Sequence, residues 1–142
     1  MTTTKKRAII LLAATLLLVI LELVPYSLRL NWADADNIVR SHTYVSFFSV
    51  IAIGAIHFPI ALLLTIFSFA LSIPCVLACR RYLRISQAVL LFLAAGLSLS
   101  LHPFGNADMY MPLAYIIVFG QLATALYALF GFPKQQKRTL SE

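Results

Sequence analysis

Residues 58–79 read FPIALLLTIFSFALSIPCVLAC, an uninterrupted run without a charged side chain. An α-helix rises about 1.5 Å per residue, so this run is long enough to cross a hydrocarbon core about 30 Å thick. Pro59 stands second in the run, and proline suits the first turn of a helix because the N–H that it lacks has no intrahelical partner there. The run therefore predicts a membrane-spanning helix that begins near Phe58.

The composition of the whole chain agrees with a membrane location. Of its 142 residues, 61% are hydrophobic and only 11% are charged. A soluble domain is about half apolar and about a quarter charged, so this chain has too few charges to give a soluble fold a polar surface. The composition excludes an ordinary soluble domain, a disordered chain and a nucleic-acid module. It predicts an integral protein of the cell membrane that contacts the lipid bilayer and binds no nucleic acid.

Three further apolar runs are comparable to the first in length. We therefore predict an all-α membrane protein that is a single domain over residues 1–142, with four transmembrane helices in two hairpins. The expected spans cover residues 8–28, 58–79, 85–101 and 112–132, and a basic tail covers residues 133–142.

Basic residues gather in three clusters that flank these spans, at residues 5–7, 80–84 and 134–138. Cytoplasmic loops carry an excess of Lys and Arg, so both termini and the 80–84 turn are predicted to be cytoplasmic. A basic N-terminus before an apolar run also suits a signal peptide. The small-x-small site at residues 33–35 lies too far behind that run, so we expect a retained span.

Residues 44–57 lie between the polar connection and the second span. Together with that span they would form one helix about 54 Å long, so the stretch must be divided. Several side chains before the span have the spacing of one helix face: Tyr44, Phe47, Phe48 and Ile51. We predict an aromatic-rich segment in the outer interface. A re-entrant segment or a fifth span is the alternative. A fifth span would place the basic tail and the N-terminal basic cluster on opposite sides of the membrane, so four spans are favoured.

Small and hydroxyl-bearing side chains recur along the second span at spacings of four and three. They are Ala61, Thr65, Ser68, Ser72, Cys75 and Cys79. Helices in lipid associate by close packing and weak hydrogen bonds, so this stripe predicts a helix-packing face. Gly120 and Thr124 form a comparable small face on the fourth span. A polar conduit lined by the hydroxyl groups of the stripe is the alternative.

Glu22 is the only acid inside a predicted span. An acid in hydrocarbon is usually protonated, or paired and turned toward the bundle interior. Counting helix rise from the outer boundary places Gln121 within about one turn of the same depth. His57 and His102 lie at the boundary itself, where a water would have to bridge to the carboxyl. A buried hydrogen bond that fixes packing is the expected role, and a proton-coupling or substrate site is the alternative.

The chain contains no recognisable metal or catalytic motif. His42, His57 and His102 lie on different segments without ligand-like spacing. Cys75 and Cys79 share one helix face near the cytoplasmic side, where a disulfide is not expected. No Walker loop, G-x-S-x-G or H-E-x-x-H motif occurs. We expect no metal, no cofactor and no enzymatic activity.

The motifs ELVPY at residues 22–26 and TYVSFF at residues 43–48, followed by Pro59, resemble a loose group of small four-span bacterial membrane proteins. The resemblance covers most of the chain and implies two helical hairpins, but no activity. The chain is also similar to the small multidrug resistance transporters in size, in span number and in its acid in the first span. It differs from them at Leu18, where that family has a small residue, and at Trp32, which lies in a loop. These differences argue against drug export.

Two functional hypotheses follow from these patterns. The first is a non-enzymatic protein that assembles with itself or with another membrane protein, because the small-residue stripe favours helix packing. The second is a small proton-coupled transporter that uses Glu22, because ionisable groups inside spans often mark proton relays.

Overall fold

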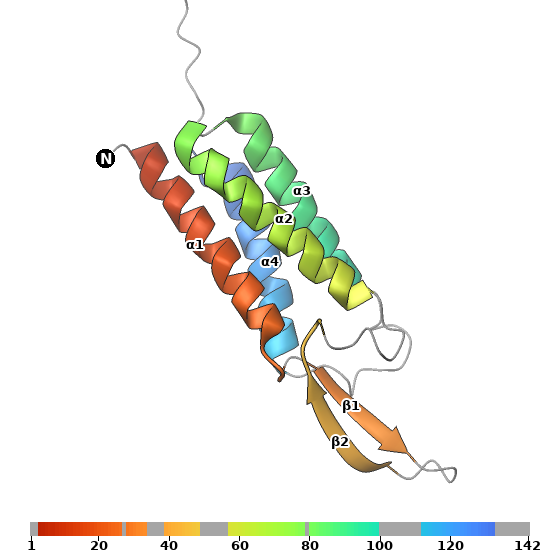
Figure 1. Ribbon diagram of the computed structural model, residues 1–142. Coiled ribbons are helices and arrows are strands. Elements are labelled where there is room, and N and C mark those ends of the chain that lie inside the picture. Colours follow the sequence, from red (N-terminus) through yellow and green to blue (C-terminus); the bar gives the residue numbers. More distant parts are fainter. Residues whose placement is uncertain are drawn as a thin grey trace, which may run out of the picture.

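The computed structural model describes residues 3–26, 28–33, 39–48, 57–78, 80–99 and 112–132. Within them lie four helices and two strands (Figure 1): α1 Thr3–Leu23, β1 Leu28–Ala33, β2 Val39–Val45, α2 His57–Ala78, α3 Arg81–Leu99 and α4 Pro112–Phe130. The expectation of a helical fold is confirmed for the four long elements. The two strands were not predicted.

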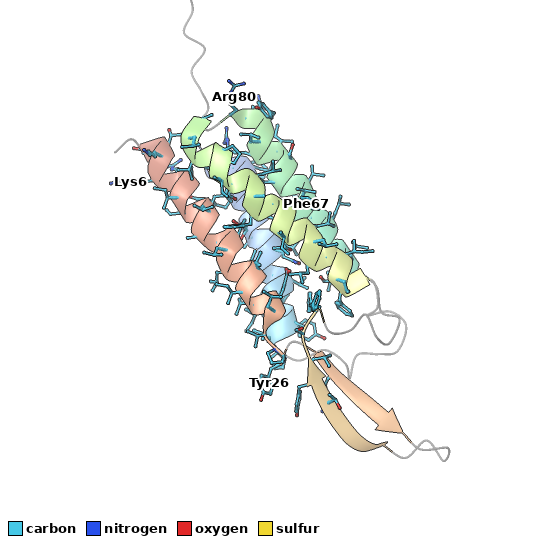
Figure 2. All side chains as sticks on the ribbon, in the orientation of Figure 1. Lys6, Tyr26, Phe67 and Arg80 are labelled. Atoms are coloured by element: carbon cyan, nitrogen blue, oxygen red, sulfur yellow. The ribbon has the colours of Figure 1, made fainter. Side chains whose placement is uncertain are left out.

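The four helices form a bundle in which each packs mainly against two others. α1 contacts α2 and α4, and α3 contacts the same two helices. The two-stranded sheet projects from one end of the bundle, which we call the hairpin end (Figure 1). The start of α1 lies at the opposite end, together with the end of α2 and the start of α3. We call this the basic end, because Lys6 and Arg80 both lie there (Figure 2).

α1 ends earlier than predicted, at Leu23 rather than near residue 28. Pro25 has no N–H to donate and disfavours helical backbone at Val24, so the helix stops before it. A turn follows, in which the Val24 N–H donates to the Leu21 carbonyl at 3.2 Å. Leu28, expected at the end of the span, is instead the first residue of β1.

The polar connection after α1 is a β-hairpin. β1 and β2 pair antiparallel, with Leu28 opposite Val45 and Ala33 opposite Val39. The register shifts between Trp32 and Ala33, an irregularity of the kind that a β-bulge produces. Backbone groups that a loop would leave to water are thus paired with each other.

The interfacial segment predicted over residues 44–57 does not begin as a helix. Tyr44 belongs to β2, and Phe47 and Phe48 lie in a turn directly after it. The helical spacing of these aromatic residues was therefore misinterpreted, because strand pairing with β1 decides the backbone here. Residues 49–56 lie outside the described part of the chain.

The remaining helices lie close to the predicted spans. α2 begins at His57, with Pro59 in its first turn, and α4 begins at Pro112. α3 begins at Arg81, four residues before the predicted span, so the basic turn is partly helical. α2 also contains Pro74, which lacks the N–H that would donate to the Ala70 carbonyl. The basic tail from residue 133 lies outside the described residues.

The bundle carries apolar side chains on its surface and polar side chains inside. Each helix exposes large hydrophobic residues, among them Leu17, Phe67, Leu93 and Phe119. Figure 2 shows Phe67 on the outer face of α2. The fully buried residues include several polar ones: Thr15, Glu22, Thr65, Ser68, Ser72, Gln87, Ser98 and Gln121. A soluble helix bundle shows the reverse distribution, so this one suits apolar surroundings.

Three helices are long and apolar enough to cross a membrane: residues Phe58–Ala78 of α2, all of α3 and all of α4. They are compatible with a membrane protein. α1 is not among these three helices. Its uncharged run covers only residues 8–21, because it is bounded by Lys5, Lys6 and Arg7 on one side and by Glu22 on the other.

Candidate functional site

Glu22 lies on the one face of α1 that the bundle buries. The buried residues of α1 recur at spacings of three and four: Ala8, Leu11, Thr15, Leu18 and Glu22. This is the period of a single helix face. Glu22 is 0% exposed although it lies one residue from the end of the helix. Its carboxyl therefore faces the bundle interior.

Two neutral side chains from two other helices bond to this carboxyl. Thr65 of α2 donates its hydroxyl to Glu22 Oε1 at 2.8 Å, and Gln121 of α4 donates from Nε2 to the same oxygen at 2.7 Å. Gln121 Nε2 also donates to Thr65 Oγ1 at 3.2 Å. We call these three residues the Glu22 ring. The contact between Glu22 and Gln121 is the one that helix depth predicted, and Thr65 is the third member that the structure adds.

Two oxygen atoms of the Glu22 ring accept no hydrogen bond from the described residues. They are Glu22 Oε2 and Gln121 Oε1, and both are buried. α2 and α4 contain no Lys or Arg, and the side chain of their one histidine, His57 at the start of α2, lies outside the described part. A buried charge without a partner is strongly unfavourable in an apolar interior. A proton or another small cation bound at the ring would therefore remove an unfavourable buried charge.

An apolar layer separates the Glu22 ring from the hairpin end. It consists of Val45, Phe47, Phe58, Leu62, Ala114 and Ile117, and we call it the apolar cap. The rings of Phe47 and Phe58 are both fully buried, and their centres lie 5.0 Å apart. The Phe47 N–H donates to the Glu22 carbonyl at 3.1 Å, so the chain leaving the β-hairpin is tied to the last turn of α1. Apolar side chains thus cover this side of the buried carboxyl.

A second polar cluster lies deeper in the bundle. Thr15 precedes Glu22 by seven residues on α1, about 10 Å along the axis. Thr15 Oγ1 lies 3.1 Å from Ser72 Oγ of α2. Gln87 of α3 donates from Nε2 to Ser72 Oγ and, at 3.2 Å, to the Ser68 carbonyl. Gln87 Oε1 is buried without a partner.

Buried hydroxyl groups lie along one face of α2 between the positions of the two clusters. Thr65 belongs to the Glu22 ring, Ser72 belongs to the second cluster, and Ser68 lies between them in sequence. All three are fully buried. The Ser72 hydroxyl donates to the Ser68 carbonyl at 3.1 Å. We call this line of buried polar groups the polar seam.

The small-residue stripe of α2 thus faces the interior of its own chain. Its members Thr65, Ser68, Ser72 and Cys75 are all 0% exposed. Their partners lie on α1, α3 and α4, so this stripe is not available to a second copy. Gly120 approaches α1 rather than α2, since a Cβ added there would lie 2.8 Å from Leu18 Cδ2. Thr124 is also buried.

Two arginines close the basic end of the bundle. Arg7 donates from Nη1 to the Gly131 carbonyl at 2.6 Å. The Arg84 guanidinium lies 4.3 Å from the centre of the Phe132 ring, a cation–π contact. Arg84 is buried, and its Nε has no partner. These contacts fix the segment after α4 against α1 and α3.

The sequence indicated some of these residues but not others. Gln87 and Gln121 are the only glutamines within the predicted spans, and this rarity was a signal for Gln87 that was overlooked. No pattern indicated the burial of Phe47, because it depends on the unpredicted β-hairpin. The side chain of His57, and all of His102 and Cys79, lie outside the described part. The described residues hold no group of three potential metal ligands.

No family model, curated protein or solved structure matches this chain. The site is therefore interpreted from its own chemistry.

Proposed function

We propose that the chain is a multi-pass protein of the cell membrane with four transmembrane helices in two hairpins and both termini in the cytoplasm. Three apolar helices and the apolar outer surface of the bundle support this. α1 serves as the fourth span because residues 8–21 are uncharged and Glu22 turns away from lipid. Lys5 and Lys6 reach toward the interface, as long basic side chains do at helix ends.

Within this frame, we propose that the protein is a small proton-coupled transporter and not an enzyme. The observation that carries the proposal is the Glu22 ring: a fully buried carboxyl held by two neutral side chains, with one oxygen that accepts no described hydrogen bond and no Lys or Arg on α2 or α4. An acid in such a place is favoured as a proton carrier, because gaining or losing a proton there removes or creates a buried charge. The polar seam offers a route for the proton toward the basic end.

Proton movement in vesicles tests this proposal. Purified protein is reconstituted in phospholipid vesicles that contain a pH-sensitive dye, a pH gradient is imposed, and valinomycin with potassium discharges the membrane potential. Vesicles with the wild type should lose the gradient faster than protein-free vesicles, and vesicles with Glu22→Gln should not. Phe67→Leu is the matched control, because Phe67 is exposed on the outer face of α2 and should leave the rate unchanged. Equal rates for the wild type and Glu22→Gln, or no proton movement with either, would exclude this function.

Assembly with a second copy or with a membrane partner is the competing proposal. The α2 stripe is occupied within the chain, so assembly would have to use a lipid-facing surface. Gly96 of α3 offers one, since it is exposed and nothing lies within 4 Å of the position of a Cβ there. Small residues of this kind allow two helices to approach closely in lipid. A single cysteine at this position, Gly96→Cys with Cys75 and Cys79 replaced by Ala, should then crosslink between copies in native membranes. A chain that stays monomeric and captures no other protein would exclude assembly.

A further inference from the structure

We propose that the Glu22 ring holds one proton, bound to Glu22 Oε2 and donated to Gln121 Oε1, so that the two side chains form a two-point acid–amide pair. The inference rests on the proposed function, since it names the species that Glu22 carries and the state in which the resting protein holds it. It gives Gln121 the role of a positioning residue for that proton.

The hydrogen-bond inventory of the ring supports this assignment. Glu22 Oε1 accepts from Thr65 and from Gln121, and the second N–H of Gln121 donates to Thr65 Oγ1. The single hydroxyl hydrogen of Thr65 has a second acceptor, the Ala61 carbonyl at 3.1 Å. The donors of the ring are therefore engaged. Two acceptor oxygens remain, and they belong to the two residues that are already bonded to each other. One added proton turns Oε2 into a donor and satisfies both oxygens at once, which is what buried polar groups require.

The geometry of the two groups also allows the second contact. A carboxylic acid and a primary amide present complementary edges: the amide N–H meets one acid oxygen, and the acid O–H meets the amide oxygen. The first of these contacts is present at 2.7 Å. The terminal torsions of Glu and Gln side chains are broad, so rotation about them is the movement by which the second pair of atoms would align.

The charges around the ring favour the neutral form of the acid. α2 and α4, which pack beside Glu22, contribute Thr65 and Gln121, and neither helix contains a Lys or Arg. Their one histidine is His57, at the start of α2 and about two turns before Thr65, and its side chain lies outside the described part. The apolar cap contributes no ionisable group. Arg29 of β1 is the described cation nearest in sequence, and no described hydrogen bond joins its Nε to the carboxyl. Uptake of a proton from water forms the Oε2–H bond and removes the negative charge, so the site becomes neutral.

The same inventory argues against a metal cation as the occupant. Na⁺ and other hard cations bind several oxygen atoms at once, as the six or more oxygen ligands of Ca²⁺ and Mg²⁺ illustrate. The ring offers two free oxygens, which is the number that a single bridging proton needs.

Infrared spectroscopy of the full-length protein in lipid bilayers tests the proposal directly. At neutral pH, the difference between the wild type and Glu22→Gln should contain a protonated-carboxyl band, which is separate from carboxylate bands. The band should shift in Gln121→Leu, because the acid loses its amide partner. It should stay in place in Gln87→Leu, which removes an equally buried glutamine from the other polar cluster. Glu22→Leu provides a second reference spectrum if Glu22→Gln does not fold.

Three results would overturn the proposal: a carboxylate band of Glu22 at neutral pH, an acid band that Gln121→Leu leaves in place, or an acid band that falls when Na⁺ replaces choline in the buffer. The last result would identify Na⁺ as the occupant. The outcome is distinct from that of the vesicle experiment. An acid band without proton movement supports the acid–amide pair and excludes transport. Proton movement with an ionised Glu22 supports transport and overturns the acid–amide pair.

Discussion

Glu22 is the residue on which most of the molecule's chemistry depends. It joins three helices through the Glu22 ring, and the two helices that hold its carboxyl contain no Lys or Arg. Its neighbours are neutral hydrogen-bonding groups, so the size and hydrogen-bonding capacity of the side chain at this position should matter more for stability than its acidity.

Substitutions at Glu22 separate these properties. Glu22→Gln should leave the melting temperature in detergent close to that of the wild type, because an amide can accept from Thr65 and donate to Gln121 Oε1. Glu22→Leu should lower stability by about 1–3 kcal/mol, because the polar groups of Thr65 and Gln121 lose a partner in an apolar interior. Thermal unfolding monitored by circular dichroism checks both variants. Equal melting temperatures for Gln and Leu would show that the hydrogen bonds of the ring do not stabilise the fold.

Gln87 tests the polar seam at the residue scale. Gln87→Leu removes a buried unpartnered oxygen as well as two hydrogen bonds, so the net change in stability should be below about 1 kcal/mol. The rate of proton movement in vesicles should nevertheless fall, because Ser72 loses the polar group of α3 that is bonded to it. Ser86→Leu is the control, since the neighbouring Ser86 is exposed. A wild-type rate in Gln87→Leu would show that protons do not pass along this cluster.

At the scale of elements, the β-hairpin acts as a support for the apolar cap. It places Phe47 inside the bundle and anchors it by the backbone bond to Glu22. The next residue, Phe48, points outward and is 61% exposed. The pair therefore provides a substitution and its control at adjacent positions.

Phe47→Ala should open the hairpin side of the Glu22 ring to water. A cysteine introduced by Thr65→Cys, with Cys75 and Cys79 replaced by Ala, should react faster with a membrane-impermeant maleimide when Phe47 is also replaced by Ala. Phe48→Ala should leave the reaction rate unchanged. The lost burial should also destabilise the protein by about 3 kcal/mol. Equal labelling in both backgrounds would show that the cap does not control access to the ring.

At the scale of the whole molecule, the two ends of the bundle differ in both charge and structure. Apart from the basic residues of the hairpin itself, the described basic residues gather at the end opposite the sheet. They are Lys5, Lys6, Arg7, Arg80, Arg81 and Arg84. By the positive-inside rule, we expect this end to face the cytoplasm and the β-hairpin to face outward.

Reporter fusions check this orientation. A reporter that is active only in the cytoplasm should be active when it is fused after Glu142. The same reporter should be inactive when it is inserted between β1 and β2, at residues 34–38. A reporter that is active only outside should give the opposite pattern. Cytoplasmic activity at both positions would mean that α1 does not cross the membrane.

The sequence by itself determined the helical character of the fold and the approximate position of each long apolar helix, and it indicated Gln121 as the partner of Glu22 at the nearest depth. Length, hydropathy and proline positions are local properties, and helix rise converts them directly into depth. Because an acid is costly in lipid, the depth of Glu22 was enough to predict that it faces a polar group.

Only the tertiary structure decided which helix faces meet and how the polar connection folds. The β-hairpin depends on pairing between residues 28–33 and 39–45, which is a non-local choice, and the burial of Phe47 follows from it. The small-residue stripe was compatible with packing inside one chain or between chains. Its partners Thr15, Glu22 and Gln87 lie on other helices of the same chain, and only their arrangement in space made the stripe a polar seam.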